Sequence, residues 1–130
     1  MKKKIKKDKS VMWLVKIPLF DVELAIRVNM SAEEANKETF DRYKVKPAEG
    51  FQKFTDTGMT QGQFTAFHCG GYAIWIKDIR NSSGLLHELM HFVQYLYRDR
   101  RIPMNEDTEE LYAYTIAYVA EQVLKMKIRK

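Results

Sequence analysis

The sequence predicts an α+β domain in which a small antiparallel sheet is followed by two antiparallel helices. Apolar and polar residues alternate over much of 11–28, as they do in strands with one buried face. An apolar period of about 3.6 residues runs over 83–98 and again from 109 to about 125, which is typical of amphipathic helices. Because the link between these two segments is short, we expect the helices to pack antiparallel.

The first half of the chain is expected to supply strands and one helix. Residues 11–20 and 22–28 are predicted strands, and a proline in the first of them marks an edge strand or a bend. Ser31 and Glu34 form the S-x-x-E pattern of a capping box, which predicts a helix that runs to about Tyr43.

The next predicted strands lead into the first amphipathic helix. Residues 51–63 are rich in Gly, Thr and Gln and are expected to form a loop or a hairpin. Residues 63–69 and 72–77 are predicted as two strands that flank Gly70 and Gly71.

The run His87-Glu88-Leu89-Met90-His91 lies in the first amphipathic helix. Residues i and i+4 of a helix lie one above the other, so His87 and His91 can bind a single zinc ion. Glu88 is rotated by about 100° from His87 and can act as a general base on a water at the metal. The H-E-x-x-H run therefore predicts a catalytic zinc site.

The predicted helix has two chemically different faces. One face carries an apolar stripe of Leu86, Leu89, Val93, Leu96 and Tyr97. The other face carries Gly84, His87, Glu88, His91, Gln94, Tyr95 and Arg98. Since core histidines would more often lie in the apolar stripe, this arrangement favours metal ligands over two core histidines on an ordinary helix.

A catalytic zinc usually has three protein ligands, so one ligand remains to be identified. A histidine six residues after His91 is excluded because Tyr97 stands there, and we therefore expect a carboxylate. Asp99 lies about 12 Å along the same helix from His91, which is too far to reach the metal. The second helix is the better source.

Glu110 is the predicted third ligand, because it shares a face of the second helix with other polar or small residues. The apolar side of that helix comprises Tyr112, Ile116, Val119 and Val123, and the other face comprises Glu110, Tyr114, Ala117 and Glu121. Glu109, which points toward the apolar side, is the alternative ligand. Asp107 and Glu110 also fit a D-x-x-E capping box, so Glu110 could instead serve the start of the helix.

The H-E-x-x-H run followed by Glu110-Leu111-Tyr112-Ala113-Tyr114 resembles the gluzincins. These are zinc metallopeptidases in which two histidines and a glutamate from a following helix bind the metal. The segment from 71 to 119 is more closely similar to small, phage- and microbe-encoded proteins called minigluzincins. The larger thermolysin-like members have an aspartate four residues after the glutamate, where this chain has Tyr114.

The resemblance implies a zincin-like domain that hydrolyses peptide bonds with a zinc-activated water. Glu110 would complete the ligand set of the two histidines, and Glu88 would be the general base. For stabilisation of the transition state we expect one of four donors, with Tyr114 first and then Tyr95, Arg98 and His68. The resemblance also implies that the strand at 72–77 forms the rim of the cleft, where an extended peptide substrate could pair.

Two other interpretations remain open. A zinc-stabilised structural or binding module, such as a phage component without efficient proteolysis, would keep the metal site. A core of helices and strands without metal would keep only the fold.

Basic residues gather at the two ends of the chain. Residues 1–10 carry a charge of +5 and residues 125–130 carry +4, which leaves −4 of the total +5 for the body. We therefore expect a disordered basic tail at 1–10, a single domain at 11–125 and a basic C-terminal tail at 126–130. The acidic body does not predict nucleic-acid binding, although the tails could contact nucleic acid.

The sequence also bears on location. The single cysteine, Cys69, rules out an internal disulfide and favours a reducing compartment. The apolar run that follows the N-terminal lysines ends after five residues at Lys16, which is too short for a signal peptide. No segment reaches transmembrane length. We expect no membrane partner, a peptide or protein substrate, and a cytoplasmic location, which is the host cytoplasm if a phage encodes the chain.

Overall fold

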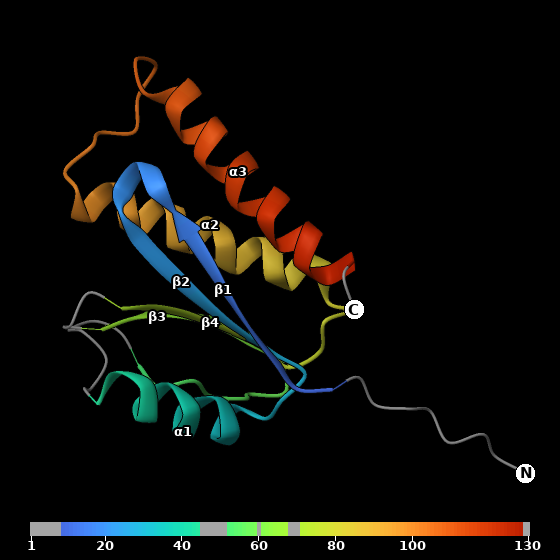
Figure 1. The fold of residues 1–130 in the computed structure, drawn as a ribbon. Coiled ribbons are helices and arrows are strands. Elements are labelled where there is room, and N and C mark those ends of the chain that lie inside the picture. Colours follow the sequence, from blue (N-terminus) through green and yellow to red (C-terminus); the bar gives the residue numbers. More distant parts are fainter. Residues whose placement is uncertain (1–8, 45–51, 60, 68–70, 129–130) are drawn as a thin grey trace, which may run out of the picture.

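The computed structural model describes residues 9–44, 52–59, 61–67 and 71–128. The elements in chain order are β1 (Val11–Ile17), a 3-10 turn (Pro18–Phe20), β2 (Val22–Val28), α1 (Ala32–Tyr43), β3 (Gly62–Ala66), β4 (Tyr72–Ile76), α2 (Ser82–Asp99) and α3 (Glu109–Ile128). The sheet lies between α1 on one face and α2 with α3 on the other (Figure 1). The molecule is thus an α+β domain, as predicted.

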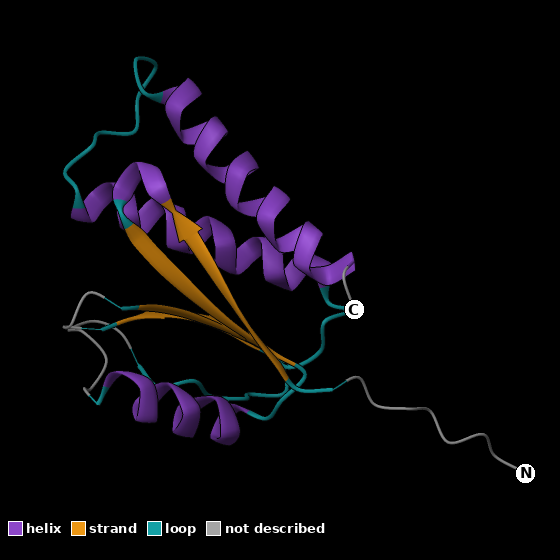
Figure 2. Cartoon of the chain, in the orientation of Figure 1, coloured by secondary structure: helices purple, strands orange, loops and turns teal. Residues whose placement is uncertain are grey.

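The sheet is mixed, so the prediction of an antiparallel sheet is wrong. Its strand order is β1-β2-β4-β3. The outer pairs, β1 with β2 and β3 with β4, are antiparallel, whereas the central pair runs parallel from Leu24 opposite Tyr72 to Val28 opposite Ile76. The chain passes through α1 between the two hairpins and returns to the same end of the sheet, which makes the central pair parallel (Figure 2).

The strand before α2 is internal, and the prediction that it forms the rim of the cleft is also wrong. β4 pairs with β2 on one side and with β3 on the other, and all five of its residues are buried. A continuous apolar run of this kind is typical of a strand covered on both faces. The edge beside α2 is formed by β3.

Two hydrophobic clusters hold the three layers together. The cluster between the sheet and helices α2 and α3 includes Leu24, Ile26, Ile74, Phe92, Leu96, Val119 and Val123. The cluster between the sheet and α1 includes Met30, Ala35, Phe54, Phe67 and Trp75. α2 packs on β3 and β4, while α3 packs on α2 and β1. The sheet therefore fixes the orientation of the helix that carries both histidines.

Capping side chains set where two helices begin. The Ser31 hydroxyl accepts the backbone N–H of Glu34 at 3.1 Å, which confirms the predicted start of α1. The side chain of Asn81 accepts the N–H of Gly84 at 3.0 Å and starts α2 at Ser82. α2 (Ser82–Asp99) and α3 (Glu109–Ile128) are slightly longer than the predicted helices at 83–98 and 109–125.

α3 packs against α2 through a buried polar contact, and the two helices are antiparallel as predicted (Figure 1). The hydroxyl of Tyr97 lies 2.7 Å from the hydroxyl of Thr115. Thr115 also bonds the carbonyl of Leu111 at 2.8 Å, so its proton is committed and Tyr97 is the donor in the pair. The ring of Tyr112 lies edge-on to that of Tyr97, with centroids 5.4 Å apart.

We expect Thr115→Val to destabilise the fold more than Tyr97→Phe does. Valine leaves the buried hydroxyl of Tyr97 without this acceptor, at a cost of about 1–3 kcal/mol, whereas phenylalanine removes the donor and costs about 1 kcal/mol. Urea denaturation of both single variants and the double variant measures the difference. Equal losses in the two single variants would contradict the assigned direction of the hydrogen bond.

The predicted tails lie mostly outside the described residues, which begin at Lys9 and end at Ile128. Residues 126–128 continue α3. His68 and Cys69 also lie outside the described residues. Among the helices that the structure describes, none combines the length and the apolar character needed to cross a membrane.

Candidate functional site

The two histidines of the H-E-x-x-H run present their ring nitrogens to each other on the exposed face of α2. Their Nε2 atoms are 3.0 Å apart, and the ring centroids are 4.7 Å apart. Two nitrogen ligands of a tetrahedral zinc are separated by about 3.3 Å, given a Zn–N bond of about 2.0–2.1 Å. The same spacing suits a hydrogen bond between neutral rings. His87 and His91 therefore fit two corners of a zinc site without a change in the backbone.

Glu88 is buried between α2 and the edge strand, with 8% of its surface exposed. Its Oε1 accepts the backbone N–H of Phe64 at 2.9 Å, and its Oε2 lies 3.9 Å from Nε2 of His87. One carboxylate oxygen is thus bound to β3, and the other lies near the histidines. The carboxylate joins the edge strand to the candidate metal site.

A cavity of about 340 Å³ opens beside this group. Its lining residues are Phe64, Glu88, His91, Gln94, Tyr95 and Arg98. A volume of this size suits a small part of a ligand, such as one or two side chains of a peptide. A second hollow, of about 420 Å³, lies on the α1 side of the sheet and contains none of the predicted site residues.

Tyr95 and Arg98 are the predicted transition-state donors that the structure brings to the cavity. Burial, and then the negative charge of Asp99, raises the pKa of Tyr95, which keeps its hydroxyl a hydrogen-bond donor. Tyr114 is 71% exposed on α3 and does not line the cavity. Its role as a stabiliser stays a prediction, and the geometry favours the other two residues.

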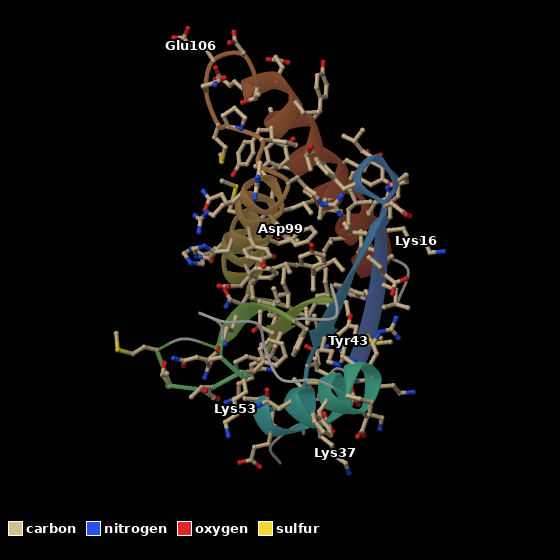
Figure 3. The ribbon with its side chains drawn as sticks, turned by 90° about the vertical axis from the view of Figure 1, so that its left-hand side faces the viewer. Lys16, Lys37, Tyr43, Lys53, Asp99 and Glu106 are labelled. Atoms are coloured by element: carbon tan, nitrogen blue, oxygen red, sulfur yellow. The ribbon has the colours of Figure 1, made fainter. Side chains whose placement is uncertain are left out.

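The third zinc ligand is not in place among the described residues, which contain no group of three His, Cys, Asp or Glu side chains able to hold a metal. Glu110 is exposed in the first turn of α3. At about 100° per residue, it lies about 160° around the helix from the packed Tyr112, whereas Glu109 lies about 60° from it. Glu106, at the outer tip of the loop between α2 and α3, points away from the sheet (Figure 3).

The strand predicted at 63–69 is present as β3, but its position at the edge of the sheet, beside the histidines, was not predicted from the sequence. Its first residue, Gly62, was expected to lie in a loop. A Cβ atom there would lie 2.7 Å from Cδ1 of Ile76 and 3.8 Å from Cγ of Glu88, so glycine permits this close approach. The alternation of Gly62, Phe64 and Ala66 was the available signal.

The site thus contains a histidine pair, a buried carboxylate and an edge strand, and His91, Glu88 and Phe64 line the cavity beside them. Comparison of the chain with protein-family models, curated proteins and solved structures finds no match.

Proposed function

We propose that the chain is a zinc-dependent metallopeptidase of gluzincin type. The observation that carries this proposal is the position of the Glu88 carboxylate, 3.9 Å from His87, while the Nε2 atoms of His87 and His91 lie 3.0 Å apart. Two histidines one helical turn apart with a carboxylate beside them are the pattern of a hydrolytic zinc site, in which the histidines bind the metal and the carboxylate is the general base.

His87 and His91 would hold the zinc. When bound, zinc acts as a Lewis acid and makes a water molecule a stronger nucleophile. Glu88 then takes a proton from the attacking water and delivers it to the leaving amine, so protons balance over the two steps. Tyr95 and Arg98 line the same cavity and can donate hydrogen bonds to the carbonyl oxygen as it gains negative charge.

The position of β3 at the edge of the sheet favours a peptide as the substrate. Lys77 donates to the carbonyl of Gln61, and Phe67 donates to the carbonyl of Gly71, so alternate residues of β3 pair with β4. The backbone N–H and C=O of Phe64 therefore point away from β4, because hydrogen-bonded and non-hydrogen-bonded residues alternate along an antiparallel pair. An extended polypeptide can add to such an edge through main-chain hydrogen bonds, which places its peptide bonds beside the histidines.

Glu110 is our proposed third ligand, and its recruitment requires a change at the first turn of α3. We expect Glu110→Gln to weaken zinc binding at least tenfold and Glu109→Gln to leave it unchanged, because amide oxygens are poorer zinc ligands than carboxylates. Titration with a competing zinc chelator measures both affinities. A loss confined to Glu109→Gln would move the ligand to that residue.

A metal-binding module without proteolytic activity is the second candidate function. The exposed position of Glu110 favours it, because a site with only two histidines in place is not a complete catalytic site.

Two measurements test these proposals. Elemental analysis of protein purified without added metal should find one equivalent of zinc, and its absence would contradict both candidates. The zinc-loaded protein should cleave an unstructured polypeptide, and a chelator should stop the cleavage. Bound zinc without any cleavage would favour the binding module.

A further inference from the structure

We infer that the amide of Phe64 holds Glu88 in a resting position, and that a polypeptide bound along β3 takes over this amide and releases the carboxylate for proton transfer. The inference rests on the proposed function and names how substrate regulates the same site.

The backbone N–H of Phe64 points away from β4. Residues 61 and 67, which flank β3, form backbone hydrogen bonds with residues 77 and 71, which flank β4. The antiparallel pattern alternates, so Phe64 directs its N–H away from β4. An added strand would bond to this same N–H through a substrate carbonyl.

Glu88 already occupies this donor. Its Oε1 lies 2.9 Å from the Phe64 nitrogen and so takes the position of a substrate carbonyl. Because one N–H carries one proton, a full-strength bond to the carboxylate and a full-strength bond to a peptide exclude each other. Peptide pairing at Phe64 and the resting position of Glu88 are therefore competing states.

Only the Glu88 side chain needs to move when a peptide pairs with β3. The ring of Phe64 packs against the rings of Phe92 and Tyr95, each at a centroid distance of 5.8 Å. These contacts fix β3 relative to α2. The released carboxylate would turn toward His87, which is already 3.9 Å from its other oxygen.

The consequence is a general base that becomes available when substrate is paired with the edge strand. Part of the binding energy of the peptide is used to break the bond between Glu88 and Phe64, as in induced fit. In the resting state one oxygen of the base would stay bound to β3, although the other already lies 3.9 Å from Nε2 of His87.

The test uses the full chain without zinc, so that cleavage does not interfere. Glu88→Ala removes the acceptor, Glu88→Gln keeps a neutral acceptor of the same size, and Glu106→Ala removes a carboxylate at the distant loop tip as the matched control. Amide hydrogen exchange of Phe64 should be at least about tenfold faster in Glu88→Ala than in wild type, since the amide loses a buried hydrogen bond.

A mixed-sequence library of unstructured octapeptides then serves as the binding probe. We expect it to bind Glu88→Ala about tenfold more tightly than wild type, with Glu88→Gln between them, because a hydrogen bond to a charged group no longer competes. Bound peptides should also slow the exchange of the Phe64 amide in Glu88→Ala.

Equal affinities for wild type, Glu88→Ala and Glu88→Gln, no detectable binding, or an unchanged Phe64 exchange rate in Glu88→Ala would overturn the inference. Failure of the proposed function would give a different result. The zinc-loaded wild type would then not cleave a polypeptide, although the octapeptides would still bind Glu88→Ala most tightly and wild type least tightly.

Discussion

Glu88→Gln is expected to lower the turnover of an unstructured polypeptide by about 10²-fold or more, the usual scale for the loss of a positioned general base. Glutamine has the size of glutamate and can still accept the N–H of Phe64 through its amide oxygen. It cannot take a proton from the attacking water. Zinc content and the free energy of unfolding should therefore stay near the wild-type values.

The measurement compares initial rates for zinc-loaded wild type and Glu88→Gln, with chelator-treated samples of both. Glu106→Gln is the matched control, since it makes the same change in charge at the loop tip (Figure 3). Zinc-dependent cleavage that continues undiminished in Glu88→Gln would refute the proposed mechanism. If wild type also fails to cleave, the metal-binding module becomes the better interpretation.

His91→Ala is expected to abolish the stabilisation of the fold by zinc. A ligand present at about 1,000 times its dissociation constant stabilises the native state by about 4 kcal/mol. For a domain of this size, that corresponds to a rise in Tm on the order of 10 °C. Because His91 is exposed, its removal should change the stability of the metal-free protein little.

Thermal unfolding with and without zinc measures this effect. Gln94→Ala is a suitable control, since Gln94 lines the same cavity but is not a proposed ligand. A zinc-dependent rise in Tm that persists in His91→Ala would place the metal elsewhere in the chain.

The helices were predictable because their signals are local. Caps such as Ser31 and apolar periods of about 3.6 residues depend on neighbours within one or two turns. The spacing of His87 and His91 is local in the same way, and the structure places their Nε2 atoms together. Such features require no knowledge of the rest of the fold.

The arrangement of the sheet was not predictable from the same signals. Alternation marks a strand but does not say which strand lies beside it or in which direction it runs. The apolar run at 72–76 fits an internal strand as well as the strand expected there, and only pairing with β2 places it in the interior. The edge beside α2 is therefore formed by β3, which was predicted as a strand from residue 63 but not as the edge of the sheet.

The surroundings of the histidines depend on how distant elements meet. Glu88 is bound by Phe64, 24 positions earlier in the chain, and no periodicity reports such a contact. Leu86 belongs to the predicted apolar stripe of α2 but is 52% exposed, whereas the other four residues of that stripe are buried. Tyr114 was predicted from its helix face, but the packing of α3 through Val119 and Val123 leaves its side chain in solvent.

The parallel pair at the centre of the sheet has a consequence for the folding rate. Each hairpin can form from residues that are close in sequence, but Leu24 meets Tyr72 only after 48 positions of intervening chain have been closed into a loop. The entropy of that closure must be lost before the contacts between β2 and β4 offset it. We therefore expect the docking of the two hairpins to limit the rate, and folding to take milliseconds or longer. Shortening the side chains of Ile26 and Ile74 on this seam should slow folding, whereas changes at the outer face of α3 should mainly affect unfolding.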